Sequence, residues 1–456
     1  MKVCTDLKSG RLSSENIAQN FCDVQESVTL SNIENMTSQC LYCYDAPCVE
    51  ACPTGIRVPE FIRRISTGNI KGAALEILEK NPLGGTCARV CPVESLCEGA
   101  CVKNKLNQHS VPIGALQRFA VDSVLNESKP LFSPKKPSGK KVAVVGSGPA
   151  GLTCAHKLAL NGHKIVIFEA RSKAGGLNEY GIAKYKMTDD WAQKELELIC
   201  QAGEIEILYG KTLGVDVQLQ FIRQEFDAVF LSIGLGSANE WGLENSALPG
   251  VYNAVDFIAR IRQTSDLHTL EVGRRVIVIG GGSTSLDIAC QIKKLGAQRV
   301  TVCYRKSKHD MPASEKEQQF VEKHQVIIKT CVNPISLKGS SGGVEAVRFE
   351  YTQRGQDGKW YGIGEYFEEP ADMVFKAIGQ QLDIDSNGVL KSCPEVQTEG
   401  GRIRVSANRE TSLDGVFAGG DCIGLSSDLT VAAVEDGKIA AQSIHSRLMQ
   451  GDQNNG

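Results

Sequence analysis

The sequence lacks several features that would assign it to common classes of protein. No apolar run reaches the length of about 18 residues that a membrane-spanning helix needs, and the N-terminal residues have no apolar centre typical of a secretion signal. We therefore expect a cytoplasmic protein that does not enter a membrane. Positive charge is not in excess, with 50 Lys and Arg against 53 Asp and Glu, which argues against a broadly basic nucleic-acid binder. The seven histidines are scattered without a triad-like arrangement, so we predict no side-chain nucleophile or general base.

The length of 456 residues exceeds what one hydrophobic core supports and predicts roughly two to four domains. Residues up to about Ser138 read as short helices and loops, with apolar residues at helical spacing from Pro59 to Lys80. The stretch NESKPLFSPKKPSGKK is rich in Pro, Ser and Lys and is typical of a linker.

The chain then contains two copies of a strand, glycine turn, helix and strand, which begin near Lys141 and Arg274 and lie about 130 residues apart. This pattern predicts an internal duplication of one βαβ unit. The strands predicted at Asp227–Gly234 and Ala371–Gly379 are of the kind that close such domains, and the C-terminal stretch predicts a strand, a glycine turn and a long helix. The sequence therefore predicts an α/β fold with two Rossmann-like domains behind a helical one.

The first glycine motif is Gly146-Ser147-Gly148-Pro149-Ala150-Gly151, between a predicted strand and a predicted helix. In such a turn the first glycine permits the tight bend, the second lets a pyrophosphate approach the backbone, and the third allows close packing. The phosphate then lies on free N–H groups at the positive end of the helix dipole. Glu169 ends the next strand, where a carboxylate can accept hydrogen bonds from ribose hydroxyls. Together these features predict a dinucleotide site rather than a merely structural turn.

The second motif is Gly280-Gly281-Gly282-Ser283-Thr284-Ser285, which ends in a small residue other than glycine. The strand after it has no acid where a ribose 2′-hydroxyl would be held. Arg305 and Lys306 stand there instead, and they suit a 2′-phosphate, which favours NADPH over NADH. The alternative is that both are solvated surface cations.

Two nucleotide sites in one chain suggest FAD together with a nicotinamide cofactor. Gly419-Gly420-Asp421 supports this, because an acid beside a glycine turn can hold a flavin's ribityl chain; the alternative is an ordinary capped turn. A flavin disulfide reductase also needs a close cysteine pair beside its flavin. No cysteine follows Gly175-Gly176-Leu177, and Cys154 and Cys200 are isolated, so the electrons must leave the flavin by another route.

Eight of the 17 cysteines lie between Cys40 and Cys101 and offer that route. One run has the spacing C-x2-C-x4-C-x3-C followed by proline, and the other has C-x3-C-x5-C-x3-C. In a reducing compartment such a dense cluster indicates metal rather than disulfides, and thiolates at this spacing bind iron–sulfur clusters or zinc. Zinc is the weaker alternative, since a redox-silent ion gives the flavin no electron acceptor.

These residues resemble a known family. The segments CLYCYDAPCVEACP, NPLGGTCARVCPVESLCEGAC, IGALQRF, GSGPAGL and AGGDCIGL are similar to the N-terminal half of dihydropyrimidine dehydrogenase and to the NAD(P)H-oxidising subunit of its bacterial two-subunit form. The resemblance runs from about residue 36 to residue 446. The same adrenodoxin-reductase-like module occurs in the glutamate synthase small subunit and in a ferredoxin-linked transhydrogenase.

The resemblance implies two [4Fe–4S] clusters, FAD and NAD(P)H. It implies that one cluster is held by Cys40, Cys43, Cys48 and Cys101, and the other by Cys52, Cys91, Cys97 and Gln117. Cys87 is then a spare, buried thiol, although it stays open whether Gln117 or Cys87 completes the second cluster. Gln117 lies within IGALQRF, in a position where the glutamate synthase and transhydrogenase relatives tend to carry Glu.

The resemblance also implies the nucleotide-binding residues. It places FAD on Gly146, Ser147, Gly148, Pro149, Ala150, Glu169, Gly176, Leu177, Lys186, Gly420, Asp421 and Thr430. It places the nicotinamide dinucleotide on Gly282, Ser283, Thr284, Arg305, Lys306, Ala377, Ile378 and Gly379. Relatives often read F-R-L-P where this chain has Tyr185-Lys186-Met187-Thr188, so Lys186 keeps a cation without the planar fork of arginine.

The implied domains are a helical domain with two clusters (1–138), an FAD-binding domain (139–242 and 376–456) and an inserted NAD(P)-binding domain (243–375). These use the whole chain, and no barrel of about 250 residues remains to bind FMN and substrate. We therefore expect an electron-input subunit that oxidises NAD(P)H and reduces an FMN- and iron–sulfur-containing partner, where uracil or thymine becomes the 5,6-dihydro base. The alternatives are a subunit like the glutamate synthase small subunit or the transhydrogenase, and a nucleotide-sensing protein with a zinc-stapled helical domain.

Overall fold

The computed structural model describes residues 6–25, 28–125, 130–382, 395–425 and 427–453, and the first four residues of the expected linker lie outside these ranges. The chain forms two compact units, each of which combines distant parts of the sequence. Unit 1 contains Met1–Val24, Tyr180–Thr188 and Ser237–Gln381; unit 2 contains Gln25–Glu179, Asp189–Gly236 and Leu382–Gly456. Each unit is described by itself.

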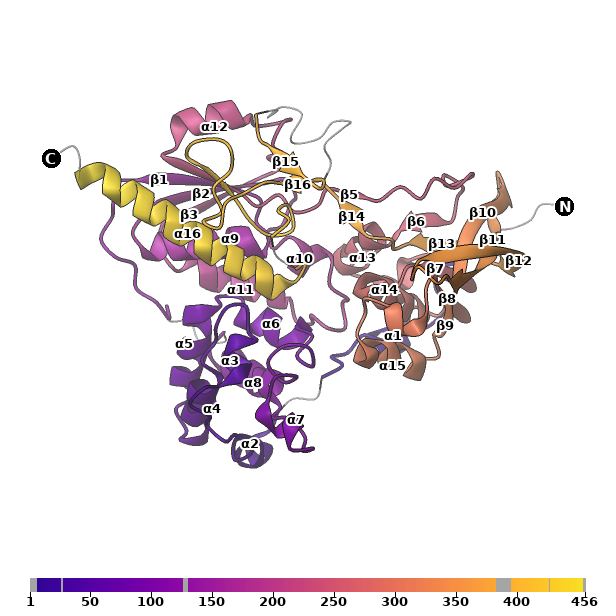
Figure 1. The fold of residues 1–456 in the computed structure, drawn as a ribbon, viewed down its shortest axis with the longest axis horizontal. Helices are drawn as coiled ribbons and strands as arrows, with labels where there is room; N and C mark the ends of the chain where they lie inside the picture. The colour runs from indigo at the N-terminus through magenta and orange to yellow at the C-terminus, as the bar shows by residue number, and fades with distance from the viewer. Residues whose placement is uncertain (1–5, 26–27, 126–129, 383–394, 426, 454–456) are drawn as a thin grey trace. The chain divides into compact units, whose positions relative to one another are not determined.

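The cysteine-bearing part of unit 2 is built from short helices joined by loops (Figure 1). The helices are α2 (Leu30–Thr37), α3 (Pro47–Glu50), α4 (Val58–Ser66), α5 (Ile70–Lys80), α6 (Gly84–Val90), α7 (Val102–Lys105) and α8 (Ile113–Leu125). The apolar stretch from Pro59 to Lys80 forms two helices, because Gly68 adopts a φ of 78° and Asn69 caps α5 by accepting a hydrogen bond from Gly72 N. The buried faces of α4, α5 and α8 form the core of this part.

The rest of unit 2 is a five-stranded parallel sheet in the order β17–β4–β1–β2–β3, covered by helices. Its strands are β1 (Lys141–Val145), β2 (Lys164–Glu169), β3 (Ile205–Tyr209), β4 (Ala228–Leu231) and β17 (Val416–Ala418). The helices are α9 (Pro149–Leu160), α10 (Leu177–Tyr180), α11 (Trp191–Cys200), α12 (Leu219–Glu225) and α16 (Thr430–Gln453), and a small ladder joins β15 (Thr398–Glu399) to β16 (Arg402–Ile403). Helix α16 lies along α9 (Figure 1), close enough that a Cβ on Gly437 would meet the carbonyl oxygen of Ala150 at 2.3 Å.

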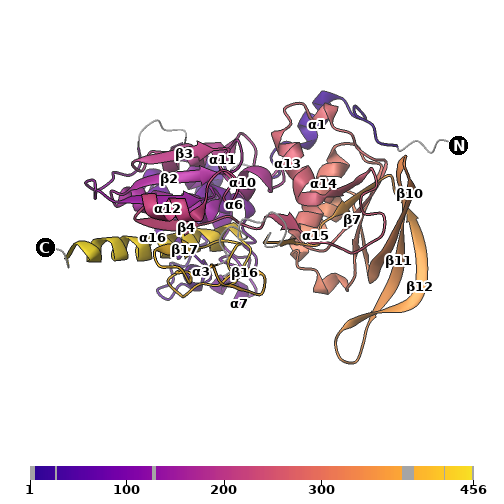
Figure 2. The ribbon, with the colours of Figure 1, turned by 90° about the horizontal axis from the view of Figure 1, so that it is seen from above.

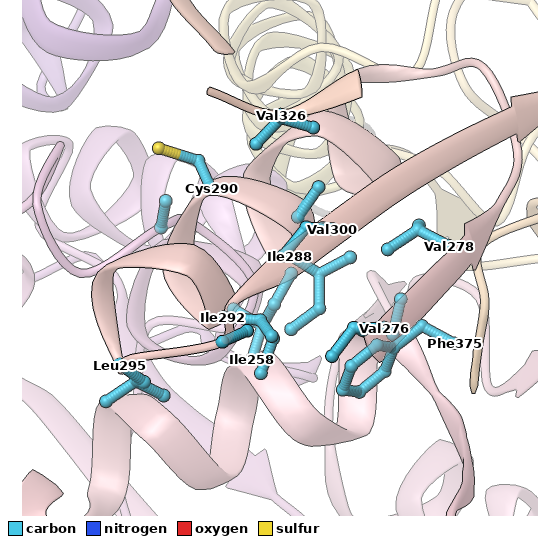
Figure 3. Close-up of a cluster of buried hydrophobic side chains, with 14 of the residues drawn as sticks. Ile258, Val276, Val278, Ile288, Cys290, Ile292, Leu295, Val300, Val326 and Phe375 are labelled. Carbon is cyan, nitrogen blue, oxygen red and sulfur yellow. The ribbon is translucent and has the colours of Figure 1, made fainter. Parts of the chain in front are cut away.

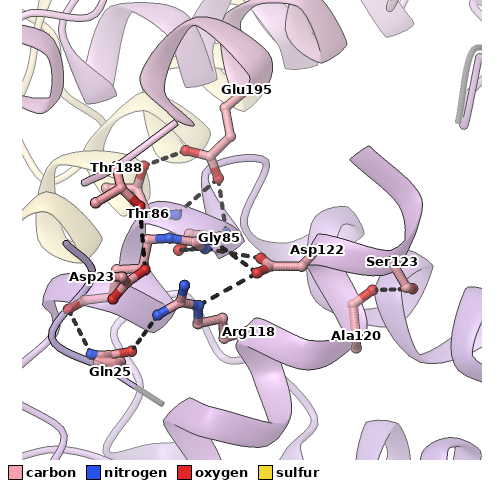
Figure 4. A network of polar contacts seen from close by, with 11 residues as sticks. Asp23, Gln25, Gly85, Thr86, Arg118, Ala120, Asp122, Ser123, Thr188 and Glu195 are labelled. Carbon is pink, nitrogen blue, oxygen red and sulfur yellow. Dashed lines mark hydrogen bonds and ion pairs between the residues drawn. The ribbon is translucent and has the colours of Figure 1, made fainter. Parts of the chain in front are cut away.

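A buried acid joins the sheet part of unit 2 to its helical part. Glu195 on α11 is 0% exposed and accepts hydrogen bonds from Gly85 N (2.8 Å), Thr86 N (2.9 Å) and the Thr86 hydroxyl, all at the start of α6 (Figure 4). Arg89 of α6 forms two 2.9 Å hydrogen bonds with Asp122 of α8 and lies 3.5 Å from the centre of the Trp191 ring. Because α6 carries Cys87 and leads into Cys91, this network fixes one cysteine segment to the nucleotide-binding part.

Unit 1 contains a second five-stranded parallel sheet, in the order β6–β13–β7–β8–β9, and an antiparallel sheet β10–β11–β12, whose long strands are seen in Figure 2. Its strands are β5 (Ser237–Ala238), β6 (Val251–Asn253), β7 (Arg275–Ile279), β8 (Arg299–Tyr304), β9 (Ile327–Thr330), β10 (Val332–Ser340), β11 (Gly343–Arg354), β12 (Trp360–Pro370), β13 (Met373–Lys376) and β14 (Gln380–Gln381). Its helices are α1 (Ser14–Asn20), α13 (Ala254–Gln263), α14 (Ser283–Lys294) and α15 (Glu315–Lys323). In both parallel sheets, the strand before the glycine motif lies between the next strand in sequence and a later strand: β1 lies between β2 and β4, and β7 lies between β8 and β13. The shared order confirms the predicted duplication.

The core of unit 1 lies between its parallel sheet and its helices (Figure 3). Figure 3 shows Val276, Val278 and Phe375 from the strands facing Ile288 and Ile292 of α14. Burying each side chain of this size contributes about 1.5–3 kcal/mol. The N-terminal segment joins this core, since Ile17 and Phe21 are buried in it and Asn20 exchanges hydrogen bonds with Lys294 (2.8 and 2.7 Å).

The predicted fold class is confirmed: a helical cysteine-bearing part is followed by two Rossmann-like parts, with the second inserted into the first. The expected domain limits at 138, 242 and 375 stay predictions. The compact units divide the chain after Val24, Glu179, Thr188, Gly236 and Gln381. Within the described ranges, no helix combines the length and apolarity needed to cross a membrane.

Candidate functional site

Four cysteines line one cavity in the helical part of unit 2. Cys40, Cys43, Cys48 and Cys101 surround it together with apolar side chains such as Val58 and Ile62. These are the four residues expected to hold the first cluster. Burial raises the pKa of Cys48 to about 11, and the three other thiols add to the rise. Among the described residues, no three His, Cys, Asp or Glu side chains converge closely enough for a single metal ion.

A second group of thiols surrounds Cys91. A hydrogen bond with Cys87 raises the pKa of Cys91 well above its ordinary value, and burial and the nearby Cys97 and Cys52 raise it further. Burial raises the pKa of Cys97 to about 12. The structure therefore brings together the three cysteines expected at the second cluster. It also brings in Cys87, which is 2% exposed as expected of a spare thiol.

Gln117 lies on α8, which packs against α6, and it is 7% exposed. Its Nε2 donates a 2.7 Å hydrogen bond to the carbonyl oxygen of Gly84, the first residue of α6. This bond points the amide nitrogen of Gln117 at the backbone. The carboxamide oxygen is then the atom that can act as a ligand. A glutamine on a solvated helix surface would not be buried in this way.

The glycines of the first motif occupy three different environments. A Cβ on Gly146 (φ 96°) would meet the Ser232 carbonyl oxygen at 2.4 Å, and a Cβ on Gly151 would meet the Gly146 oxygen at 2.1 Å. A Cβ on Gly148, the N-cap of α9, would meet nothing within 4 Å. The outer two glycines are thus required by packing, and the middle one faces open space where a phosphate could approach the helix N-terminus.

Glu169 at the end of β2 is bound to the turn that follows β1. Its Oε2 accepts hydrogen bonds from Ser147 N (3.0 Å) and from the Ser147 hydroxyl, and its Oε1 accepts from Arg171 N (2.8 Å). Gly175 N donates to the Ser147 carbonyl oxygen (3.1 Å), and a Cβ on Gly176 would meet the Gly148 Cα at 2.6 Å. The segment leading to Leu177 therefore lies against the glycine turn, so the residues predicted here for FAD form one cradle.

The C-terminal residues predicted for FAD reach the same region. A Cβ on Gly420 (φ 77°) would lie 3.1 Å from the Ala150 Cβ, and Gly420 N donates to the buried carboxylate of Asp436 (2.9 Å). Burial raises the pKa of Asp421 to about 6. The Thr430 hydroxyl donates to Asn178 Oδ1 (3.3 Å) in the turn after Gly176. Sequence reasoning missed Asn178 and Asp436, because each acts through a contact distant in sequence.

The second glycine motif repeats this geometry in unit 1. A Cβ on Gly280 would meet the Ala377 carbonyl oxygen at 2.1 Å, whereas one on Gly282, the N-cap of α14, would meet nothing within 4 Å. Ser285 replaces the third glycine; it is fully buried, and its hydroxyl donates to the Gly282 carbonyl oxygen (2.6 Å). Ser283 and Thr284 begin α14, with their backbone N–H groups at the positive end of the helix.

The other residues predicted for the nicotinamide dinucleotide follow neighbouring strands. Arg305 and Lys306 come directly after β8, and the side chain of Arg305 is exposed. Ala377–Gly379 follow β13, where the carbonyl oxygen of Ile378 accepts from Asn239 Nδ2 (3.1 Å). These turns all lie at the carboxyl ends of parallel strands, the edge at which such sheets bind ligands. Whether Arg305 and Lys306 bind a 2′-phosphate or only solvent stays a prediction.

Lys186 differs from the other residues predicted on the FAD side, because it belongs to unit 1. Its Nζ lies 2.7 Å from Asp287 Oδ1 on α14 and 3.5 Å from Glu317 Oε1 on α15. Burial works to lower the pKa of Lys186, but the two carboxylates together raise it above its ordinary value, so the lysine stays charged. A flavin contact by Lys186 stays a prediction.

Comparisons with known proteins agree with this arrangement. Residues 17–129 match the family model described as dihydropyrimidine dehydrogenase domain II, 4Fe-4S cluster, and residues 140–437 match the pyridine nucleotide-disulphide oxidoreductase model. The glutamate synthase [NADPH] small chain of Escherichia coli (strain K12) is 33% identical over 443 residues, which cover 93% of each chain. The NAD-dependent dihydropyrimidine dehydrogenase subunit PreT of the same strain is 34% identical over 412 residues, covering 90% of this chain and 93% of that one.

The chain belongs to the family of the glutamate synthase small chain and PreT. It is an NAD(P)H-dependent flavin oxidoreductase with a 4Fe–4S cluster domain. The match to a 4Fe-4S cluster domain favours an iron–sulfur site over the zinc-stapled alternative.

Solved structures show the fold alone. Thioredoxin reductase from T. acidophilum superposes with a TM-score of 0.53 at 19% identity, covering 68% of this chain and 99% of that one. FprA from Mycobacterium tuberculosis in complex with NADPH gives 0.55 at 19% identity, covering 70% and 86%. The two Rossmann-like parts of this chain thus have the thioredoxin-reductase-like fold.

Proposed function

We propose that this family member is the electron-input subunit of an NAD(P)H-dependent dihydropyrimidine dehydrogenase. In this proposal it carries FAD and two [4Fe–4S] clusters and reduces an FMN- and iron–sulfur-containing partner subunit. Uracil or thymine is reduced to the 5,6-dihydro base on that partner. The observation that carries the proposal is the burial of Gln117 on α8. The resemblance described above implies that relatives of the glutamate synthase type tend to carry Glu at this position.

The arrangement of the cysteines supports two clusters rather than one. Cys40, Cys43, Cys48 and Cys101 share one cavity, while Cys91 is surrounded by Cys52, Cys87 and Cys97. Gln117 is bound to the first residue of α6, the helix that carries Cys87. In the proposed assignment Gln117 Oε1 is the fourth ligand of the second cluster, and Cys87 stays a thiol whose sulfur is hydrogen-bonded to Cys91.

The chain's own residues bind and orient the two nucleotides. The N-terminus of α9 receives the FAD pyrophosphate at Gly148, and Glu169 holds the ribose while it fixes the turn through Ser147. The N-terminus of α14 receives the nicotinamide dinucleotide at Gly282. A bound FAD would supply the chemistry of two-electron hydride acceptance and one-electron release. Holding the reactants in place supplies most of the catalysis here, so no general base is required.

A subunit like the glutamate synthase small chain is the second candidate. That relative matches over 93% of both chains, and its similarity is about equal to that of PreT. Its partner would be a large subunit that reduces a different substrate. The relatives are named as a small chain and as a subunit, which supports a partner polypeptide in either case.

The deciding experiment is anaerobic purification of the chain together with its partner subunit, followed by assays of NADPH and NADH oxidation. We expect oxidation that depends on uracil or thymine, and only diaphorase activity with artificial acceptors for the chain alone. Co-purification with a glutamate synthase large subunit, and oxidation that depends on glutamine and 2-oxoglutarate instead, would reject the proposal in favour of the second candidate.

A further inference from the structure

A lysine and two acids form a half-buried cluster beneath the first turn of α14. Lys186 Nζ lies 2.7 Å from Asp287 and 3.5 Å from Glu317, and the three side chains are 21%, 12% and 26% exposed. All three belong to unit 1. With one positive and two negative charges, the cluster has a net charge of −1, and removal of the lysine would leave −2.

This cluster is joined directly to the residues predicted to bind the dinucleotide. Glu317 Oε2 accepts a 3.1 Å hydrogen bond from the hydroxyl of Ser283, the first residue of α14. The same oxygen accepts from Ser314 N (3.1 Å) in the capping box of α15. Asp287 lies one turn after Ser283 on α14 and also accepts from the Tyr185 hydroxyl (3.3 Å). Two carboxylates thus lie beside the helix end that is open to a phosphate at Gly282.

Uncompensated carboxylates at that place would oppose the binding of a pyrophosphate. The helix N-terminus attracts an anion through its free N–H groups and dipole, and a neighbouring negative charge cancels this attraction. Side chains that are mostly buried are screened little by salt, so the opposing charge would act at ordinary ionic strength. A compensating cation is therefore needed, and Lys186 is the residue whose Nζ reaches both acids.

We propose that Lys186 is a positioning residue for the nicotinamide dinucleotide, which acts by neutralising Asp287 and Glu317 under the phosphate-binding turn. The inference rests on the proposed dinucleotide site at Gly282–Thr284 and gives Lys186 a role distinct from its expected contact with the flavin. Because the pyrophosphate is common to both cofactors, Lys186 supports NADPH and NADH equally. It thereby differs from Arg305 and Lys306, which would act on the 2′-phosphate alone.

The test measures binding rather than turnover. The full chain with FAD and clusters in place is titrated calorimetrically under anaerobic conditions with NADP+ and with NAD+, which do not reduce the flavin. We expect Lys186→Met to raise the Kd for both dinucleotides by about tenfold, the effect of one uncompensated charge near another. Lys186→Arg keeps the charge and should bind nearly as tightly as the wild type. Lys184→Met is the matched control, because Lys184 lies on the same segment and its Nζ donates to the Thr264 carbonyl oxygen.

A second variant distinguishes the effect of the Lys186 charge from any structural support that the Lys186 side chain gives. In Lys186→Met/Glu317→Gln the cluster returns to a net charge of −1, and glutamine preserves the capping box of α15. We expect this double variant to recover most of the lost affinity for both dinucleotides, with circular dichroism unchanged throughout. A Kd for Lys186→Met equal to that of the wild type would overturn the inference, and so would a loss that the double variant does not recover. If the wild-type chain itself bound neither dinucleotide, the proposed site and the inference would both fall.

Discussion

At the scale of single residues, Cys87 and Gln117 are the two candidates for the fourth ligand of the proposed second cluster. Cys87 lies in the middle of α6, Gln117 lies on α8 and is bonded to Gly84 at the start of α6, and both are buried. Cys87 shares a hydrogen bond with Cys91, whereas Gln117 has its amide nitrogen bound to Gly84 and its oxygen left to act as a ligand. A carboxamide ligand leaves a cluster one unit less negative than a thiolate would, and by charge alone this raises its potential.

The substitution Gln117→Cys should therefore lower the potential of one cluster and leave iron content unchanged. Redox titration followed by electron paramagnetic resonance measures the shift. Cys87→Ser serves as the control, since a spare thiol can be replaced without loss of iron. An unchanged potential in Gln117→Cys, or loss of one cluster in Cys87→Ser, would transfer the ligand role from Gln117 to Cys87.

A double substitution of Arg305 and Lys306 by alanine tests the preference for NADPH. If these cations hold the 2′-phosphate, the KM for NADPH rises by about tenfold or more, while the KM for NADH stays within about twofold. Steady-state diaphorase assays with each cofactor give both values. Equal effects on the two cofactors, or none, would identify the pair as solvated surface cations.

Glu195 makes stability depend on pH. Burial raises the pKa of Glu195 to about 7, although its hydrogen bonds with Thr86 and Gly85 oppose this rise. The folded state therefore holds a proton that the unfolded state releases near the ordinary pKa of 4.5. As the pH rises from 4.5 through 7, the free energy of unfolding should fall by about 3 kcal/mol through this group. Thermal unfolding of the wild type and of Glu195→Gln measures the difference, and the variant should lack this dependence; identical pH profiles would show that Glu195 is ionised throughout.

At the scale of elements, the two glycine turns repeat one geometry at the two proposed nucleotide sites. Each turn places a glycine at the N-cap of a helix, Gly148 before α9 and Gly282 before α14. A Cβ added at either glycine would meet no atom within 4 Å. Neither residue needs glycine for its backbone, since φ is −69° and −90° respectively. Only the approach of a ligand requires the absence of a side chain there.

The substitutions Gly148→Val and Gly282→Val should therefore act on different cofactors without unfolding the chain. Gly148→Val should reduce FAD content by about tenfold or more and leave dinucleotide affinity intact, and Gly282→Val should do the reverse. Flavin absorbance and calorimetric titration with NADP+ measure the two effects. Loss of both cofactors in either variant would mean that the turns are structural.

These elements also show what sequence reasoning can predict. The strands, the glycine turns and their helices follow local patterns, so the two duplicated units can be placed from the amino-acid sequence alone. The break between α4 and α5 depends on Gly68 and Asn69. These two residues are a local signal for the break, but the apolar residues at helical spacing on both sides of them made it hard to recognise. Contacts between distant segments could not be predicted, because nothing local marks Asn178 as the partner of Thr430, Glu195 as the cap of α6, or Lys186 as the partner of Asp287.

At the scale of the whole molecule, one chain combines a cluster domain and a pair of nucleotide-binding folds. Within unit 2, the cysteine helices and the FAD cradle are joined through Glu195, Leu83 and Trp191, so that the two parts form one packed body. Unit 1 carries the dinucleotide turn, the Lys186 cluster and the N-terminal helix α1.

The measurement that tests this account most directly is the content and reducibility of the clusters in chain purified without oxygen. The account predicts about eight iron and eight acid-labile sulfide atoms per FAD, and reduced-cluster signals in electron paramagnetic resonance after addition of NADPH or NADH. Protein that binds FAD but contains no acid-labile sulfide, or clusters that stay oxidised when the nicotinamide cofactor reduces the flavin, would contradict it.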